Sequence, residues 1–168
     1  MKVILIGLMG AGKTTIGQEL ANKLNYNFID MDIEIEKIAN MTIVDIFDKY
    51  GEDEFRRIES ELLEKIVLQE NIIISTGGGI IKKDKNRKIL KNEREVIFLD
   101  GSVDTLLRNV SNSIDNRPLL KNSDNLKIRI NQLLDERYDK YKECSNIQID
   151  INNKNINEVV SQILVYIR

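Results

Sequence analysis

The stretch Gly7–Thr15 reads GLMGAGKTT and decides how the rest of the chain can fold. It follows an apolar run, Val3–Ile6, and it opens a helical pattern in which Ile16, Leu20 and Leu24 recur every four residues. A strand, a Gly-x-x-x-x-Gly-Lys-Thr segment and a helix in this order are the context of a phosphate-binding P-loop. The alternative is a glycine-rich turn that fits by chance, but both flanks would then have to fit by chance as well.

Each part of this motif suits a polyphosphate ligand. The glycines let backbone N–H groups close around the phosphates, and the helix N-terminus adds free donors and a partial positive charge. We expect Lys13 to reach the β- and γ-phosphates and the Thr14 hydroxyl to ligate Mg²⁺. The residues of the loop that we predict to bind the nucleotide are Gly10, Ala11, Gly12, Lys13, Thr14 and Thr15.

Size and composition predict a single domain, residues 1–168, in the cytoplasm. The chain is 42% apolar and 31% charged, which is ordinary for a globular protein. Its net charge of -2 means that no excess of positive charge attracts it to nucleic acid or anionic lipid. The apolar runs are too short to cross a membrane, and the N-terminus enters a strand at once, which leaves no room for a signal peptide. The single cysteine, Cys144, excludes an internal disulfide. Because the chain has no histidine, a carboxylate must handle protons.

Two acids follow the predicted second strand, Phe28-Ile29, in the segment Asp30-Met31-Asp32. Carboxylates at i and i+2 of an extended segment point the same way. Strand C-termini form the ligand crevice of an open parallel sheet, so we expect both acids to converge on the phosphate loop. The alternative is a solvated cap on a helix that starts at Ile33.

Two arginines lie off the apolar stripe of a predicted helix from Glu52 to Leu68. From periodicity alone, Arg56 and Arg57 are expected to be solvated, or paired with Glu59 at i+3 or with Glu61 at i+4.

Three glycines, Gly77, Gly78 and Gly79, follow the predicted buried strand Ile72–Ser75. A plain turn needs only one or two glycines. Three suggest that another molecule approaches the backbone closely, whereas the alternative is a flexible loop.

A polar excursion over residues 110–124 contains the only proline, Pro118, directly after Arg117. It is either a functional lid that carries Arg117 or a disordered loop with no role.

Arg137 lies in register with the apolar face of the predicted helix Leu126–Glu143. Its charge either reaches the edge of the core or faces a ligand anion.

About five strands alternate with helices along the chain, which predicts an α/β fold with a parallel sheet and helices on both faces. A small P-loop protein with an acid pair and a candidate lid suggests a small-molecule kinase. If the acceptor is a hydroxy acid, Arg56 and Arg137 could bind its carboxylate.

Over essentially its whole length the chain resembles the shikimate kinases. The resemblance is carried by Gly7–Thr15, Asp30–Glu36, Ile46-Phe47, Gly51-Glu52, Phe55–Glu59, Thr76–Gly79, Arg117–Leu120, Arg137 and Tyr141. It implies phosphorylation of the 3-hydroxyl of shikimate by ATP with Mg²⁺, on the way to chorismate and aromatic amino acids. It also implies the nucleoside monophosphate kinase-like P-loop fold with strand order 2-3-1-4-5. We further expect a shikimate-binding region at about 32–61, a lid at about 110–124 and a monomer.

The resemblance also assigns roles in the shikimate half of the site. It implies that Asp32 holds the shikimate hydroxyls and acts as the base or orienting group, and that Asp30 holds Mg²⁺ through water. Arg56 and Arg137 match the arginines on the shikimate carboxylate. The glycine backbone of Gly77, Gly78 and Gly79 matches the wall against the ring, with Gly78 the expected direct contact.

In the nucleotide half, Lys13 and Arg117 are expected to act on the ATP phosphates and in catalysis. The arginine near the adenine is usual at the position of Asn109, whereas here it is Arg108, one place earlier. Lys154 is our choice for the adenine-facing loop before the last helix. The alternatives are another small-molecule P-loop kinase, for gluconate or a nucleoside monophosphate, and a non-catalytic nucleotide-sensing module.

Overall fold

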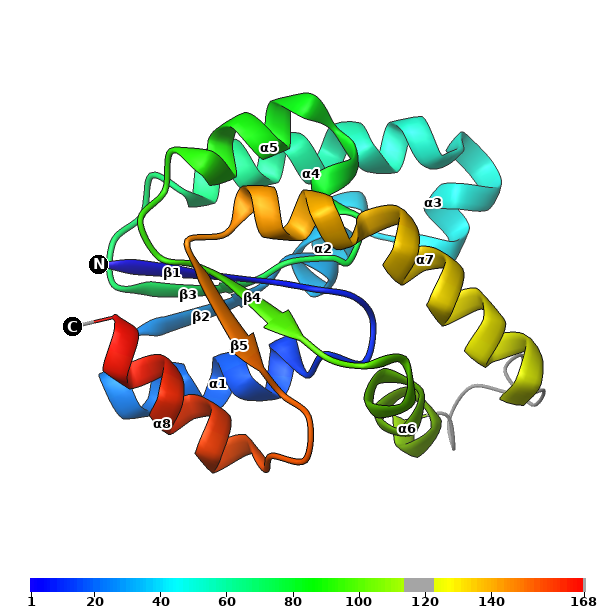
Figure 1. Ribbon diagram of the computed structural model, residues 1–168. Helices are drawn as coiled ribbons and strands as arrows, with labels where there is room; N and C mark the ends of the chain where they lie inside the picture. Colours follow the sequence, from blue (N-terminus) through cyan, green and yellow to red (C-terminus); the bar gives the residue numbers. More distant parts are fainter. Residues whose placement is uncertain (114–122, 168) are drawn as a thin grey trace.

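The computed structural model describes residues 1–113 and 123–167, which fold into a parallel sheet covered by helices (Figure 1). The strands are β1 (Lys2–Ile6), β2 (Asn27–Asp30), β3 (Ile72–Ser75), β4 (Val96–Asp100) and β5 (Ile147–Asp150). The helices are α1 (Lys13–Leu24), α2 (Met31–Ala39), α3 (Ile43–Tyr50), α4 (Glu52–Ile66), α5 (Asp84–Lys91), α6 (Val103–Ser113), α7 (Ser123–Cys144) and α8 (Ile156–Tyr166), with a 3₁₀ turn η1 (Ile80–Lys82).

The sheet has the order β2-β3-β1-β4-β5, and every pair of neighbouring strands is parallel. This confirms the α/β fold and the order 2-3-1-4-5 that the resemblance implied. Helices α1 and α8 lie on one face of the sheet, and α4, α5 and α7 lie on the other (Figure 1). Strand β1 is central, and its residues Val3–Ile6 have no exposed surface. Its continuous apolar sequence therefore reflects burial on both faces.

Parallel pairing brings the functional segments to one edge of the sheet. The P-loop follows β1, Asp30 ends β2, and the loop Thr76–Gly79 follows β3. Because these three strands are neighbours, their carboxyl ends form one crevice. The spacing of apolar runs in the sequence predicted this meeting, and the sheet order confirms it.

The ends of the predicted lid, residues 110–124, differ from the sequence-based expectation. Helix α6 continues to Ser113 and α7 begins at Ser123, so both ends of that range are helical. Arg117 and Pro118 lie outside the described residues. Within the described ranges, no helix combines the length and hydrophobicity that crossing a membrane requires.

Candidate active site

The P-loop has the backbone that its glycines predict. Gly10 and Gly12 have φ values of 81° and 80°, in the left-handed region that favours glycine. Gly12 caps α1 without a side-chain hydrogen bond, which leaves the first-turn N–H groups free for an anion. Gly10 also packs against α6, since a Cβ there would lie 2.6 Å from the carbonyl oxygen of Leu106. The loop is therefore fixed by its neighbours as well as by its own sequence.

Lys13 folds back over this loop. Its Nζ donates hydrogen bonds to the carbonyl oxygens of Gly7 (2.8 Å) and Leu8 (3.1 Å). Burial lowers the pKa of Lys13 to about 8, although the negative charges of Asp32 and Asp30 oppose the shift. The ammonium thus stands among loop carbonyls and two acids, where an anionic phosphate would favour its charged form.

Thr14 and Asp30 join the P-loop to the end of β2. The Thr14 hydroxyl donates a 2.6 Å hydrogen bond to Asp30 Oδ2. The other oxygen of Asp30 caps α2 and accepts from the backbone N–H groups of Asp32 (3.0 Å) and Ile33 (3.3 Å). Asp30 therefore caps a helix and lines the crevice at once, but the helix begins at Met31 rather than at Ile33 and the cap is partly buried rather than solvated.

The extended-segment argument for Asp32 was wrong. Helix α2 begins at Met31, because the Asp30 cap starts the helix immediately, and Asp32 lies in its first turn. The two carboxylates nevertheless line one cavity. Burial and the neighbouring charge of Asp30 raise the pKa of Asp32, and the cations of Lys13 and Arg56 oppose the rise.

A cavity of about 780 Å³ lies over the P-loop. Its walls include the P-loop residues Met9–Thr15, both acids Asp30 and Asp32, and a rim formed by Asn109 and Lys154. Arg108 is exposed and is not part of this wall, whereas Asn109 donates a 2.8 Å hydrogen bond to the carbonyl of Gly10. Lys154 lines the cavity as expected, and its Nζ donates to the carbonyl of Asp150 (2.8 Å).

A second cavity of about 360 Å³ adjoins the first, and Met9, Asp32 and Gly78 line both. The charged or glycine positions in the wall of this second cavity are Asp32, Arg56, Glu59, Gly77, Gly78, Gly79, Arg129 and Arg137. Asp32 therefore stands where the two cavities meet. This is the position from which one carboxylate can act on a group that passes between two bound ligands.

Arg56 is buried, contrary to the periodicity of α4. Its side chain is 10% exposed, and its Nη1 donates a 2.7 Å hydrogen bond to Oε2 of Glu59, whose side chain is 0% exposed. Helix periodicity places Arg56 on the polar side, but the loop after β3 covers that side. Arg57 behaves as periodicity predicts, because it is 53% exposed and pairs with Glu54 and Glu61.

Glu59 also lines the second cavity, although its sequence position indicates only a pairing partner for an arginine. Burial raises the pKa of its carboxyl, and the Arg56 guanidinium opposes the rise. Its Oε1 is buried and has no hydrogen-bond partner in the part of the chain that the structure describes. The i+3 spacing from Arg56 was the available signal, but only the tertiary structure shows that both side chains line a cavity.

The three glycines after β3 are required mainly by the protein's own side chains. A Cβ on Gly77 would lie 2.9 Å from Asp32 Oδ1 and 3.0 Å from Glu59 Oε1. A Cβ on Gly79 would overlap the guanidinium of Arg56. Only Gly78 has room, since no atom lies nearer than 3.6 Å to the place that a Cβ would take there. Contacts within the protein thus explain Gly77 and Gly79, while all three glycines line the second cavity and the approach of another molecule to them stays a prediction.

Arg137 reaches the second cavity from α7, a position that favours the ligand-facing interpretation over the edge of the core. Its Nη1 lies 3.8 Å from the Cβ position of Gly78. Its Nε is buried without a hydrogen-bond partner among the described residues. Tyr141, one turn later, donates a 2.5 Å hydrogen bond to the carbonyl of Gly78 and so braces α7 against the glycine loop.

A P-loop over one cavity, with acids and arginines around a second, defines a P-loop phosphotransferase for a small anionic acceptor. The family model described as shikimate kinase matches residues 9–168. The chain belongs to the shikimate kinase family, and it is a phosphotransferase with an alcohol group as acceptor.

Individual relatives agree with this assignment. A shikimate kinase of Clostridium botulinum (strain Eklund 17B / Type B) is 46% identical over 162 residues, which cover 96% of this chain and 94% of that one. The structure of shikimate kinase from Acinetobacter baumannii in complex with shikimate has a TM-score of 0.89 at 36% identity and covers 99% of this chain and 92% of that one. A gluconokinase from Sinorhizobium meliloti has a TM-score of 0.63 at 16% identity, with 98% and 89% of the chains covered, and therefore shares the fold alone.

Proposed function

We propose that ATP occupies the cavity over the P-loop, that shikimate occupies the adjoining cavity, and that the γ-phosphoryl group crosses between them at Asp32. One observation supports this assignment above all. Two buried polar atoms without partners among the described residues, Glu59 Oε1 and Arg137 Nε, belong to residues of the second cavity. Buried polar groups are normally paired, so this cavity suits a ligand with its own hydroxyl and carboxylate groups.

The phosphates are held by backbone and cation together. The N–H groups of Gly10–Thr15 surround the β- and γ-phosphates at the N-terminus of α1, and Lys13 leaves its carbonyl partners to bind them. Asn109 and Lys154 line the same cavity, where the base would lie. Arg117, outside the described residues, keeps its sequence-based assignment as a lid arginine, and Arg108 is the weaker candidate for the adenine.

The acceptor is held by opposite charge and by shape. The guanidinium groups of Arg56 and Arg137 bind the shikimate carboxylate, since planar forks match its geometry. Gly78 lets the ring approach the backbone. Asp32 accepts a hydrogen bond from the 3-hydroxyl, which points toward the phosphate loop. Residues 32–61 thus supply one part of the acceptor-binding region, and the glycine loop and α7 supply the other.

Mg²⁺ fits the oxygen donors beside the P-loop. The Thr14 hydroxyl and the Asp30 carboxylate already lie 2.6 Å apart at the cavity wall. No cluster of three or more acidic, histidine or cysteine side chains suited to a metal occurs among residues 1–113 and 123–167. This agrees with a cation that takes a few protein oxygens and completes its shell with phosphates and water. Bound there, Mg²⁺ would neutralise phosphate charge.

The chemical step needs little covalent help from the protein. The bond between the γ-phosphorus and the ADP oxygen breaks while a bond to the 3-hydroxyl oxygen of shikimate forms, and the hydroxyl proton passes to Asp32. The carboxylate's raised pKa suits it to receive a proton. Lys13 offsets charge on the transferred group.

A panel of acceptors tests this function. Purified protein is given MgATP with shikimate, gluconate or nucleoside monophosphates, and ADP release is measured. Turnover with shikimate should exceed the others by orders of magnitude. Equal rates across the panel would contradict the assignment, and binding of ATP without binding of shikimate would favour a nucleotide-sensing module. We further propose a monomer that acts in the cytoplasm, which sedimentation and cell fractionation can check.

A further inference from the structure

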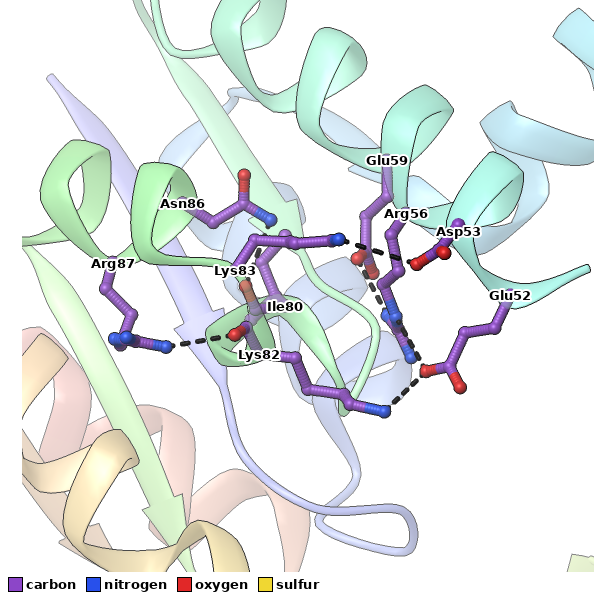
Figure 2. Close-up of polar contacts among 9 residues, drawn as sticks. All are labelled: Glu52, Asp53, Arg56, Glu59, Ile80, Lys82, Lys83, Asn86 and Arg87. Atoms are coloured by element: carbon purple, nitrogen blue, oxygen red, sulfur yellow. Dashed lines mark hydrogen bonds and ion pairs between the residues drawn. The ribbon is translucent and has the colours of Figure 1, made fainter.

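Glu52 lies between two cations that come from different segments of the acceptor site (Figure 2). It is the first residue of α4, and its Oε1 accepts hydrogen bonds from Arg56 Nε (3.3 Å) and Lys82 Nζ (2.5 Å). Lys82 ends η1, which directly follows the glycine loop. One carboxylate oxygen therefore connects the two chain segments that shape the second cavity.

This carboxylate completes the fixation of Arg56. The guanidinium uses Nε for Glu52 and Nη1 for Glu59, and its face lies against Gly79. Glu52 and Glu59 therefore fix two edges of the guanidinium, and Gly79 lies against the third nitrogen, Nη2. Glu59 is fully buried, but Glu52 is 44% exposed, so Glu52 needs a second partner to hold one rotamer.

Charge balance gives Lys82 a second effect. The residues in the wall of the second cavity carry three positive and two negative formal charges, from Arg56, Arg129, Arg137, Asp32 and Glu59. Glu52, in contact with Arg56 just outside the wall, cancels the remaining positive charge. Lys82 restores it. The hydrogen bond from Lys82 is also the largest cause that lowers the pKa of Glu52, so this carboxylate is charged in the working pH range.

We propose that Lys82 is a positioning residue for the acceptor carboxylate: through Glu52 it fixes the Nε edge of Arg56 and neutralises an acid that competes with the acceptor for that arginine. The proposal rests on the proposed function, since it assumes that Arg56 binds the carboxylate of shikimate. Lys82 itself does not line the cavity, and it touches no reacting atom.

The chain provides a matched control next to this residue. Lys83 also faces α4 and forms an ion pair with Asp53 (Nζ–Oδ1, 3.6 Å), as Figure 2 shows. Asp53 is 99% exposed, so its ion pair lies in solvent rather than at the cavity. Replacing Lys83 removes the same charge from the neighbouring position without touching the Glu52–Arg56 contact.

The test compares Lys82→Met, Lys82→Arg and Lys83→Met with the wild type by steady-state kinetics, varying shikimate and ATP separately. Lys82→Met should raise KM for shikimate about two- to fivefold. This fold-change corresponds to the free energy that a partly exposed ion pair contributes. It should leave kcat and KM for ATP within about twofold, and 0.5 M salt should shrink the difference. Lys82→Arg should restore the KM, and Lys83→Met should match the wild type.

A double-mutant cycle with Glu52→Gln separates positioning from general stabilisation. If Lys82 acts through Glu52, Lys82→Met should have less effect on KM in the Glu52→Gln background than in the wild type. Equal KM values for Lys82→Met and Lys83→Met in an active enzyme, or equal effects in both backgrounds, would overturn this proposal alone. Absence of shikimate turnover by the wild type would overturn the proposed function and this proposal together.

Discussion

Arg56 and Glu59, one turn apart on α4, form a hydrogen-bonded ion pair inside the protein. The distance from Nη1 to Oε2 is 2.7 Å, and the two side chains are 10% and 0% exposed. The second oxygen of Glu59 points toward the glycine loop with no partner among the described residues. A buried pair of this kind holds a rigid arginine in place, and it costs stability when only one partner is removed.

Glu59→Gln should therefore weaken both the fold and acceptor binding. The amide still accepts one hydrogen bond, but it leaves Arg56 without its buried counter-charge. We expect a loss of about 1.5–3 kcal/mol in the free energy of unfolding, measured by urea denaturation. KM for shikimate should rise about tenfold while KM for ATP changes little. Glu61→Gln, which removes an exposed partner of Arg57, is the control, and an equal effect of both variants would contradict the prediction.

Asp32→Asn should remove most of the turnover. If Asp32 receives the hydroxyl proton, kcat should fall about 10²–10⁴-fold, whereas a residue that only positions the hydroxyl should lose much less. In the wild type, kcat/KM should fall on acidification at a pH above the ordinary aspartate range, because burial and the charge of Asp30 raise the pKa of Asp32. A variant with wild-type kcat would exclude Asp32 as the base.

Arg137→Ala should act mainly on acceptor binding. Its guanidinium is part of the second cavity, and its Nε lacks a partner among the described residues. We expect shikimate affinity to fall by about 2–5 kcal/mol, measured by calorimetry in the presence of ADP. Arg57→Ala, at an exposed position of α4, should leave the affinity unchanged. Unchanged affinity in Arg137→Ala would remove this arginine from the site.

Lys13 should contribute to the pH dependence of the free energy of unfolding in the absence of nucleotide. Its pKa is about 8 in the folded protein, against an ordinary lysine value of 10.5. Between these values the unfolded chain binds more protons than the folded one, so the free energy of unfolding should rise as pH increases from about 8 to 10.5.

Lys13→Met is the comparison for this effect. It should lose the rise in stability over that pH window, and it should also abolish turnover because no cation reaches the transferred phosphoryl group. Denaturant titrations at several pH values measure the first effect. Parallel pH curves for the two proteins would show that Lys13 is not held at a lowered pKa.

Much of the fold could be predicted because it depends on local patterns. The P-loop context placed β1 and α1, and alternating apolar strands and amphipathic helices predicted a parallel sheet. The carboxyl ends of parallel neighbours must share an edge, so the meeting of the P-loop, Asp30 and the glycine loop followed as well. The exact start of α2 could not be predicted in this way, because it depends on whether Asp30 caps the helix or continues the strand.

What the sequence by itself determined is the P-loop, the α/β class and, through the resemblance, the family. What the tertiary structure decided is which side chains share a cavity. Arg56 and Arg57 are adjacent and chemically identical, and helix periodicity places both on the polar side. Only the packing of the glycine loop over α4 buries Arg56 with Glu59 and leaves Arg57 in solvent. The physical reason is that burial and charge pairing across a cavity are set by contacts between distant segments, which the pattern of one helix does not contain.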